Sequence, residues 1–321
     1  MLGNVCKIGL IGLGKMGQNH LRILLLLKEV ELVFIFDSDF KILEKTGKKF
    51  NLDISSEIRL NDDLNKVDAV IICTPTITHS EYICRCSKFV KNIFVEKPLA
   101  SNLKETYDLH KFIVDSNLNV KIGFIERFNP AVQQLKNVIL KSKGVVNIDF
   151  KRTNKISSRI KDVDVVIDLM IHDIDLALYL NGPFKSIDAN GYCNSGMIDF
   201  AIAVITHENG RTSRVLASRI TDKKMRLIEA TCLDMFIDCD LLRKEIVINK
   251  QSKTEDNEDK LYSVIAMQES VEVSSQEALL SELQAFIRST KKDQLIDTSS
   301  SLEALNAMKI CDKVQKIILG A

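Results

Sequence analysis

Three residues have types and spacing that could move a proton and stabilise a developing negative charge. Asp168 and His172 lie four positions apart, and residues four apart on a helix share a face. A carboxylate in that position could orient the imidazole and fix its tautomer. Lys97 follows the apolar run 93–95, which has the character of a buried strand. An imidazole, a carboxylate and a lysine are side chains that can take part in acid–base chemistry. Alternatively, Asp168 caps a helix and His172 is a core histidine.

A glycine-rich turn, Gly12-Leu13-Gly14-Lys15-Met16-Gly17, joins a predicted strand to a predicted helix. In a dinucleotide-binding turn, Gly12 permits the sharp bend, Gly14 lets a pyrophosphate approach the backbone, and Gly17 lets the helix pack on the strand. The helix N-terminus adds free amides for phosphate oxygens. We therefore expect Lys15 and Met16 to lie beside a bound cofactor.

The residue that ends the next predicted strand, Asp37, indicates which cofactor. It lies about 20 residues beyond the glycine turn, where a carboxylate accepts hydrogen bonds from adenosine ribose hydroxyls. The following Ser38 and Asp39 offer no cation for a 2′-phosphate. NAD is therefore favoured over NADP, although an Asp after a strand also often caps the next helix.

Two further loops are expected at the same sheet edge, where ligands of open α/β sheets bind. The first follows the predicted strand 69–73, and the second contains Glu96 and Lys97. Each loop alone is ordinary, since a Lys-Pro pair is usually a solvated turn and a histidine can simply start a helix. The cofactor-contact residues expected in the first loop are Cys73, Thr74, Pro75 and His79.

The order of elements that would position these residues predicts two domains. Short β-branched runs at 5–11, 31–37, 69–73, 93–95 and 120–124 alternate with helical patterns, which favours an α/β fold with a doubly wound parallel Rossmann sheet over residues 1–122. Strands then follow one another with few helices, at 145–151, 186–192, 200–206, 212–217, 226–231 and 245–248. This pattern predicts that residues 123–321 form an α+β domain with an open, mostly antiparallel sheet. Within it we expect a buried helix at 165–180 and an exposed loop at 251–260. Two helices, at 277–289 and 301–318, should close the chain, and the last could pack back on the first domain.

Composition excludes several classes of protein. The chain has 44 basic and 43 acidic residues, so no net field draws it to nucleic acid or an anionic membrane. Its apolar runs are far shorter than the roughly 20 residues that cross a bilayer. The N-terminus enters a strand pattern at once, which predicts a cytoplasmic protein. Its eight cysteines are scattered, apart from Cys84 and Cys86, so we expect free thiols and no metal site.

Five segments in order, GLGKMG, CTPTITH, FVEKPLA, GFIERFNPA and DLMIHDIDLALYL, resemble the Gfo/Idh/MocA oxidoreductase family over essentially the whole chain. The resemblance implies a nicotinamide cofactor in the first domain, substrate against the sheet of the second, and homodimers or homotetramers formed through that sheet. Lys97 matches the lysine of the EKP motif, and Asp168 and His172 match the D-x-x-x-H pair. The implied reaction is oxidation of a secondary alcohol, with hydride passing to the nicotinamide and the hydroxyl proton to His172 or Lys97. Lys97 would polarise the developing oxyanion in either case.

The segments around residues 125–131 and 168–180 look most like the branch that oxidises the 3-hydroxyl of UDP-N-acetylglucosamine. A nucleotide diphosphate needs local cations, and Arg127 and Arg159 are the expected substrate contacts. Lys151, Arg152 and Lys161 lie in the same basic stretch, which is also typical of an exposed hairpin. Asn129 could bind a sugar hydroxyl or the nicotinamide amide, or only shape the turn before Pro130.

Other functions stay open. They are a dehydrogenase of free sugars or inositols, a biliverdin-reductase-like enzyme, and a non-enzymatic regulator that senses NAD. The three acid–base candidates argue against the regulator, and a tetrapyrrole reductase would not need the Asp–His pair. A metal site at Asp168, His172 and Asp173 fits poorly, because Asp173 turns away from the shared helix face. The segment 231–236 lacks the glycine-containing turn of many relatives, so the loop shape there is not predicted.

Overall fold

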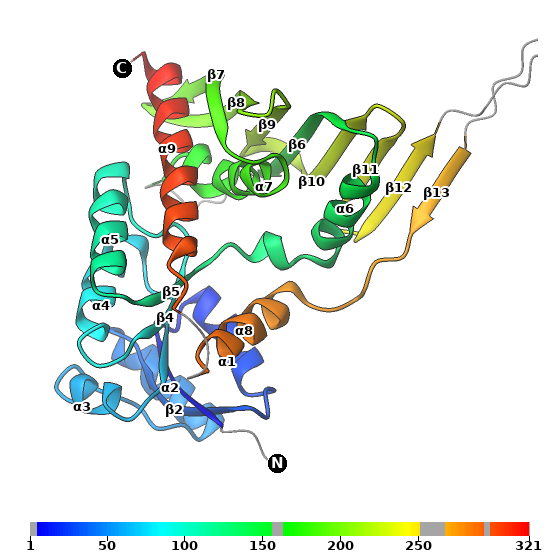
Figure 1. Ribbon diagram of the computed structural model, residues 1–321. Helices are drawn as coiled ribbons and strands as arrows, with labels where there is room; N and C mark the ends of the chain where they lie inside the picture. The colour runs from blue at the N-terminus through cyan, green and yellow to red at the C-terminus, as the bar shows by residue number, and fades with distance from the viewer. Residues whose placement is uncertain (1–4, 156–162, 251–266, 292–295, 321) are drawn as a thin grey trace, which may run out of the picture. The chain divides into compact units, whose positions relative to one another are not determined.

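The computed structural model describes residues 5–155, 163–250, 267–291 and 296–320 (Figure 1). The chain forms two compact units. The first comprises Met1–Ile125 and Leu279–Lys309, and the second comprises Glu126–Ala278 and Ile310–Ala321. Both units are therefore discontinuous in sequence, because the chain returns to the first one after building most of the second.

The first unit contains a five-stranded sheet in the order β2-β1-β3-β4-β5, and every adjacent pair is parallel. Its strands are β1 (Cys6–Ile11), β2 (Val30–Phe36), β3 (Ala69–Ile72), β4 (Asn92–Glu96) and β5 (Asn119–Gly123). All four residues of β3 are inaccessible to solvent, as expected for a parallel strand covered on both faces. The predicted doubly wound parallel sheet is confirmed, with strand ends within a few residues of those expected.

Helices alternate with these strands. They are α1 (Lys15–Leu24), α2 (Phe40–Phe50), α3 (Leu60–Leu64), α4 (His79–Cys86), which follows the 3-10 turn η1 (Thr76–Thr78), and α5 (Leu103–Asp115). Asp39 caps α2 by accepting hydrogen bonds from the amides of Lys41 and Ile42. Asn102 caps α5 in the same way, by accepting a hydrogen bond from the Glu105 amide. These caps satisfy amides that a helix start would otherwise leave without a partner.

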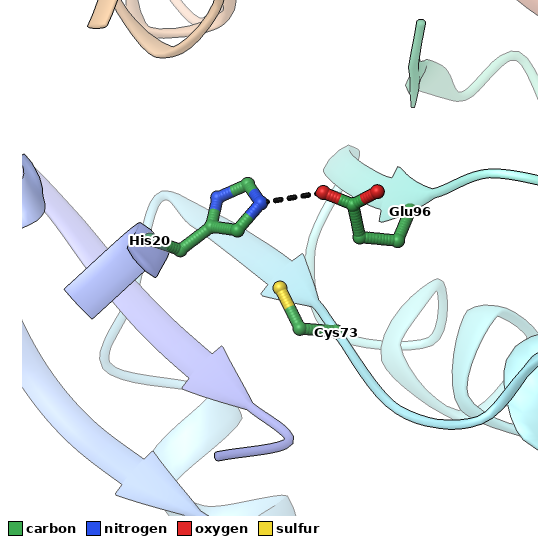
Figure 2. Close-up of side chains that lie close together, drawn as sticks. All are labelled: His20, Cys73 and Glu96. Atoms are coloured by element: carbon green, nitrogen blue, oxygen red, sulfur yellow. Dashed lines mark hydrogen bonds and ion pairs between the residues drawn. The ribbon is translucent and has the colours of Figure 1, made fainter. Parts of the chain in front are cut away.

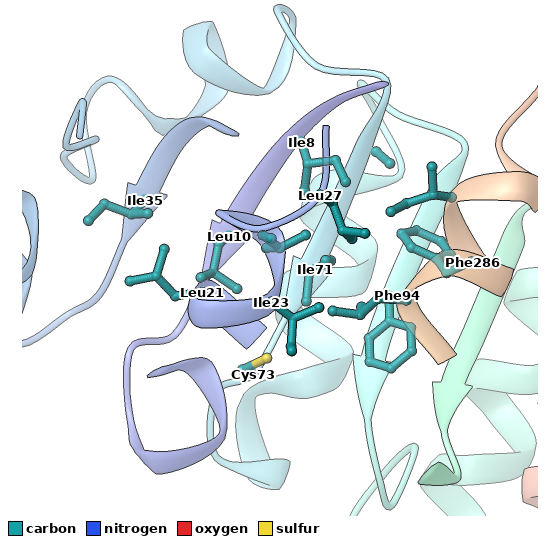
Figure 3. Close-up of a cluster of buried hydrophobic side chains, with 14 of the residues drawn as sticks. Ile8, Leu10, Leu21, Ile23, Leu27, Ile35, Ile71, Cys73, Phe94 and Phe286 are labelled. Carbon is teal, nitrogen blue, oxygen red and sulfur yellow. The ribbon is translucent and has the colours of Figure 1, made fainter. Parts of the chain in front are cut away.

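A helix from far along the chain completes this core. In α8 (Ala278–Ser289), Leu279, Leu283 and Phe286 are buried in one cluster with side chains of α1 and of β1 to β4 (Figure 3). Phe286 meets Phe94 of β4 edge-on, with ring centroids 5.6 Å apart. The last helix, α9 (Ser299–Leu319), contributes residues to both units.

The second unit contains an eight-stranded sheet in the order β13-β12-β11-β10-β6-β9-β8-β7, antiparallel except for the β6–β9 pair. Its strands are β6 (Val145–Lys155), β7 (Phe184–Asn194), β8 (Met197–His207), β9 (Thr212–Ser218), β10 (Ile220–Cys232), β11 (Phe236–Asp240), β12 (Glu245–Lys250) and β13 (Met267–Val271). Its helical segments are η2 (Ile125–Phe128), α6 (Pro130–Lys141), the π-helical η3 (Val166–Met170) and α7 (Ile171–Asn181). The predicted open, mostly antiparallel sheet is confirmed.

The structure adds elements that the sequence did not predict. Strands β11 and β13 are new, and β10 begins six residues earlier than expected. The glycine-free segment after Cys232 forms a tight connection from β10 to β11, in which the Cys232 amide donates to the Met235 carbonyl at 2.9 Å. The polar stretch 251–260 lies outside the described residues. All eight cysteines lie among the described residues as thiols outside disulfides, as predicted. Among the described helices, none combines the length and apolar character that a bilayer span requires.

Candidate active site

The glycine turn has the geometry that a dinucleotide pyrophosphate requires. Gly12 has φ +92°, and a Cβ on it would lie 2.6 Å from the Cys73 carbonyl carbon. A Cβ on Gly17 would lie 2.0 Å from the Gly12 oxygen, so only glycine lets α1 pack this closely on the turn. Gly14, the exposed N-cap of α1, has no heavy atom within 4 Å of its would-be Cβ. The turn is therefore closed around two glycines and open at the third, where phosphate oxygens would meet the helix amides.

The side chains that follow Gly14 are partly accessible. Lys15 is exposed at the first position of α1, and Met16 is half-buried. Asp37 follows β2 and is half-buried, and its Oδ2 accepts a hydrogen bond from the Leu13 amide at 2.6 Å. Its Oδ1 accepts from the Asp39 amide at 2.8 Å. Asp37 thus braces the glycine turn, Asp39 caps α2, and each Asp37 oxygen keeps a lone pair for a ribose hydroxyl.

The loops after β3 and β4 are tied together by a buried histidine. His79, 1% exposed, lies with Nδ1 2.9 Å from the Pro98 carbonyl oxygen and Nε2 3.0 Å from the Thr74 carbonyl oxygen. Burial lowers the pKa of His79, against the opposing effect of the two carbonyls. Pro75 is exposed and its carbonyl accepts from the Thr78 hydroxyl. His79 thus joins the two loops that follow β3 and β4 at the carboxyl edge of the parallel sheet.

Glu96, the residue before Lys97, contacts α1, the helix that follows the glycine turn. The His20 Nε2 of α1 donates to Glu96 Oε1 at 2.6 Å, and the His20 side chain is inaccessible to solvent (Figure 2). The Cys73 Sγ completes a group whose potential ligand atoms lie within 4.8 Å of one another. Burial raises the pKa of the Cys73 thiol, and Glu96 and Glu282 reinforce the effect. Lys97 itself is half-buried at the carboxyl end of β4.

The geometry of the His20, Cys73 and Glu96 group fits a hydrogen bond better than a metal ion. Two ligands about 2.1 Å from a tetrahedral zinc lie roughly 3.4 Å apart. The 2.6 Å between His20 Nε2 and Glu96 Oε1 is too short for that arrangement and typical of a charge-assisted hydrogen bond. A protonated, buried thiol is also a poor ligand.

In the second unit, Asp168 and His172 lie on either side of a change in helix type. Asp168 is in the π-helical turn η3, and His172 is the second residue of α7. Both side chains are half-buried. Asp164, rather than Asp168, caps this segment, because its Oδ1 accepts from the amides of Val166 and Ile167 at 3.0 and 3.1 Å. The predicted helix over 165–180 is therefore corrected to a π turn followed by an α-helix, and such turns often occur at functional sites.

A buried ion network fixes α7 against the sheet. Arg152 of β6 donates to Asp173 through Nε at 3.0 Å and Nη2 at 2.7 Å, and through Nη1 to Glu126 at 2.9 Å. Arg226 of β10 also donates to Glu126 at 3.0 Å. Burial alone would raise the pKa of the Glu126 carboxyl, but Arg152 and Arg226 hold it below its usual range. Asp173 therefore faces the sheet.

The candidate substrate residues of the second unit have internal partners. Arg127 forms a two-bond pair with Asp175 of α7, at 2.7 and 2.5 Å, and its guanidinium lies 5.2 Å from the Tyr179 ring centroid. Asn129, 7% exposed, caps α6 by accepting from the Ala131 amide at 3.1 Å, and its amide faces Glu126 at 3.2 Å. Of the roles that the sequence left open for Asn129, the structure displays the one at the turn before Pro130. Arg159 and Lys161 lie outside the described residues.

Several residues of this site were not found by sequence reasoning. His20, Glu126, Asp175 and Arg226 are among them, and their hydrogen-bond partners lie 26 to 100 residues away in sequence. Gly123 is another, because a Cβ on it would lie 3.1 Å from Glu96 Oε2. The sequence signal that could have found His20 is a histidine on the apolar face of an amphipathic helix, but such a residue is equally typical of the hydrophobic core.

The parallel sheet with its glycine turn, Asp37 after β2 and Lys97 at the end of β4 has the features of an NAD-binding oxidoreductase domain, and the α+β unit carries Asp168 and His172. Residues 6–124 match the family model "Oxidoreductase family, NAD-binding Rossmann fold", and residues 146–233 match the "GFO/IDH/MocA C-terminal domain". The chain belongs to the Gfo/Idh/MocA oxidoreductase family, and its cofactor is NAD, as predicted.

Curated relatives include several dehydrogenases. The chain is 27% identical over 251 residues to UDP-N-acetylglucosamine 3-dehydrogenase of Acidithiobacillus ferrooxidans, covering 75% of this chain and 76% of that protein. It is 29% identical over 230 residues to scyllo-inositol 2-dehydrogenase (NAD(+)) of Bacillus subtilis, covering 66% and 67%. It is 27% identical over 238 residues to the uncharacterised oxidoreductase YrbE of B. subtilis, covering 66% of each. Names of both sugar-nucleotide and inositol enzymes therefore occur among its relatives.

Solved structures share the fold over nearly the whole chain. The A. ferrooxidans UDP-N-acetylglucosamine 3-dehydrogenase superposes with a TM-score of 0.85 at 23% identity, covering 98% of each chain. An Agrobacterium radiobacter oxidoreductase in complex with NAD+, L-tartaric acid and magnesium superposes with a TM-score of 0.84 at 17% identity, covering 98% of this chain and 97% of that one. At these identities, the likeness establishes the fold of both units.

Proposed function

We propose that this oxidoreductase removes hydride from a secondary alcohol of a sugar, and that the alcohol is the 3-hydroxyl of UDP-N-acetylglucosamine. The observation that carries the reaction class is Lys97, half-buried at the carboxyl end of β4, between Glu96, which is hydrogen-bonded to His20 of α1, and Pro98, which is hydrogen-bonded to His79 of α4. The substrate assignment rests on the motif resemblance and on the 27% identical A. ferrooxidans relative of that name.

The proposed roles follow from the chemistry of each side chain. NAD, held at the open Gly14 turn and by Asp37, supplies the hydride acceptor. Lys97 donates a hydrogen bond to the substrate oxygen and stabilises its developing negative charge. His172 or Lys97 accepts the hydroxyl proton, and Asp168 orients the His172 ring.

A free polyol is the second candidate substrate, and one structural observation favours it. A diphosphate needs unsatisfied cations, yet Arg127 is paired with Asp175 and the 2% exposed Arg152 with Asp173 and Glu126. Among the described residues of the predicted basic stretch, these pairs leave fewer cations for phosphate. The inositol dehydrogenase names among the relatives agree with this alternative.

The test is an NAD reduction assay with UDP-N-acetylglucosamine, glucose and myo-inositol, with a trap for the keto product. Turnover of the nucleotide sugar alone, lost in Lys97→Ala and His172→Ala, supports the full proposal. Turnover of a free polyol keeps the reaction class and replaces the substrate. If the protein binds NAD and oxidises no sugar, the reductase or NAD-sensor alternatives take its place.

The outer face of the second sheet supports a homo-oligomer, as a homodimer or homotetramer. Tyr192, 56% exposed, pairs with Phe200, and Val204, 40% exposed, lies further along β8. Ile202 joins them on this face, opposite Leu216 of β9. Apolar side chains gathered on one sheet face are typical of a protein interface. We place the protein in the cytoplasm, where its eight thiols stay reduced.

A further inference from the structure

We propose that His20 and Glu96 form a positioning pair that holds Lys97 in register with the helix that binds the cofactor pyrophosphate. The inference rests on the proposed catalytic role of Lys97. It adds a residue, His20, that contacts neither substrate nor cofactor and acts through Glu96. The two side chains come from helix α1 and the end of strand β4, and point toward one another in Figure 2.

The hydrogen bond between the two side chains is short and shielded from water. His20 Nε2 lies 2.6 Å from Glu96 Oε1, with the His20 side chain 0% and the Glu96 side chain 13% exposed. In the part of the chain that the structure describes, the buried Nδ1 of His20 has no hydrogen-bond partner. A proton on Nδ1 would therefore be buried without an acceptor, so the neutral ring carries its proton on Nε2 and donates it to the carboxylate.

The space around the pair leaves its members little freedom. The His20 ring lies 5.3 Å from the Phe94 ring, which in turn packs on Phe286. Glu96 is in register with Gly123 of β5, where a Cβ would lie 3.1 Å from Glu96 Oε2. The carboxylate therefore sits in a space that exists because residue 123 has no side chain.

Lys97 is anchored on both sides by these contacts. Its N-terminal neighbour is Glu96, tied to α1 through His20, and its C-terminal neighbour is Pro98, whose carbonyl lies 2.9 Å from His79 Nδ1. Two fixed neighbours restrict the backbone dihedrals that aim the Lys97 side chain. Displacing a reacting group by about 1 Å can lower the rate of the reaction on the order of 100-fold.

Helix α1 connects this anchor to the cofactor. Its N-terminus is the open Gly14 position, and His20 lies on the same helix, six residues later and facing the sheet. A rigid helix therefore links the atoms expected to bind the pyrophosphate to the side chain that holds Glu96. The helix thus fixes the cofactor-binding turn and the lysine relative to one another, as required when hydride leaves the alcohol carbon and the proton leaves its hydroxyl oxygen.

The test compares His20→Leu with His20→Gln, whose side-chain amide reaches as far as Nε2 and can still donate. We expect His20→Leu to lower kcat for the sugar by roughly tenfold or more. The KM and the Kd for NADH, measured by fluorescence, should stay close to wild type. His20→Gln should recover most of kcat. The matched control is His110→Leu on α5, which removes a histidine hydrogen-bonded to Ser301 and should leave kcat unchanged.

A second readout does not depend on turnover. The rate at which Lys97 is reductively methylated, read by peptide mass spectrometry, should change several-fold in His20→Leu and return toward wild type in His20→Gln, while exposed lysines keep their rates. Equal loss in both His20 variants, or wild-type kcat and labelling in His20→Leu, overturns the positioning role. If the wild type oxidises no sugar, the proposed function fails, and the labelling comparison alone still decides whether His20 positions Lys97.

Discussion

Removal of Arg152 should destabilise the second unit far more than removal of an exposed arginine that also forms a two-bond pair with an aspartate. Arg152 is 2% exposed and makes two bonds to Asp173 and one to Glu126. Arg152→Met would leave Asp173 buried without its cation, while Glu126 keeps Arg226. Breaking one side of a buried ion pair costs about 3–5 kcal/mol, and we expect a loss in that range.

The matched control is Arg214→Met on the neighbouring strand β9. Arg214 also forms a two-bond pair, with Asp149 at 2.9 and 3.0 Å, but its side chain is 53% exposed. Exposed pairs contribute about 0.2–1 kcal/mol. Urea unfolding followed by circular dichroism measures each free energy, and hydrogen exchange of peptides from β6 and α7 assigns the loss to the second unit.

The reasoning also predicts a rescue. Adding Asp173→Asn to Arg152→Met removes the unpaired charge, so the double variant should recover part of the lost stability. Equal losses in Arg152→Met and Arg214→Met would show that burial does not set the cost. A double variant less stable than Arg152→Met would show that the Asp173 charge is not what the single variant leaves uncompensated.

Four further outcomes are expected. Gly14→Ala should keep the melting temperature but weaken NADH binding tenfold or more in fluorescence titration, because the added Cβ meets no protein atom and occupies only the space for phosphate. Gly17→Ala should also lower the melting temperature, because its Cβ would lie 2.0 Å from the Gly12 carbonyl oxygen. Asp37→Ala should weaken NAD binding and the glycine turn together, and the cofactor-free melting temperature separates the two effects. Burial lowers the pKa of His79 and His207, so the folded chain binds fewer protons than the unfolded chain. Their contribution to stability should be complete above the histidine pKa of the unfolded chain, about 6.5, and should be lost as the pH falls below it. His207→Asn should flatten this loss in urea midpoints measured against pH. Light scattering should give the mass of a dimer or tetramer, and a monomer at micromolar concentration would contradict the proposed interface.

The sequence predicted those parts of the fold whose signal is local. The strands of the first sheet are continuous apolar runs with turn residues between them, and the structure places each within a few residues of its predicted range. β11 and the first half of β10 were missed, because 220–225 is largely polar and 236–240 alternates with carboxylates. The π turn at Val166–Met170 was also missed, since apolar spacing does not separate a π turn from an α turn over five residues.

The candidate site was predictable only where its residues carry a motif. The glycine turn, Asp37 and Lys97 follow strands in a recognisable order. The partners that fix the site are remote in sequence, such as His20 and Glu96, which are 76 residues apart. Sequence reasoning also assigned Arg152 to a basic stretch facing a diphosphate, because a single chain does not reveal that Asp173 and Glu126 neutralise it.

The return of α8 to the first core has a consequence for the protein during its synthesis. Leu279, Leu283 and Phe286 belong to the buried cluster that includes residues of β1, β3 and β4, and Figure 3 shows Phe286 beside Phe94. A ribosome that has released only the first 125 residues has exposed every strand of the parallel sheet but none of these side chains. The nascent sheet therefore leaves an apolar face open until more than 150 further residues emerge. Such an intermediate is prone to aggregate, and a chaperone that shields exposed apolar surface would act in that interval.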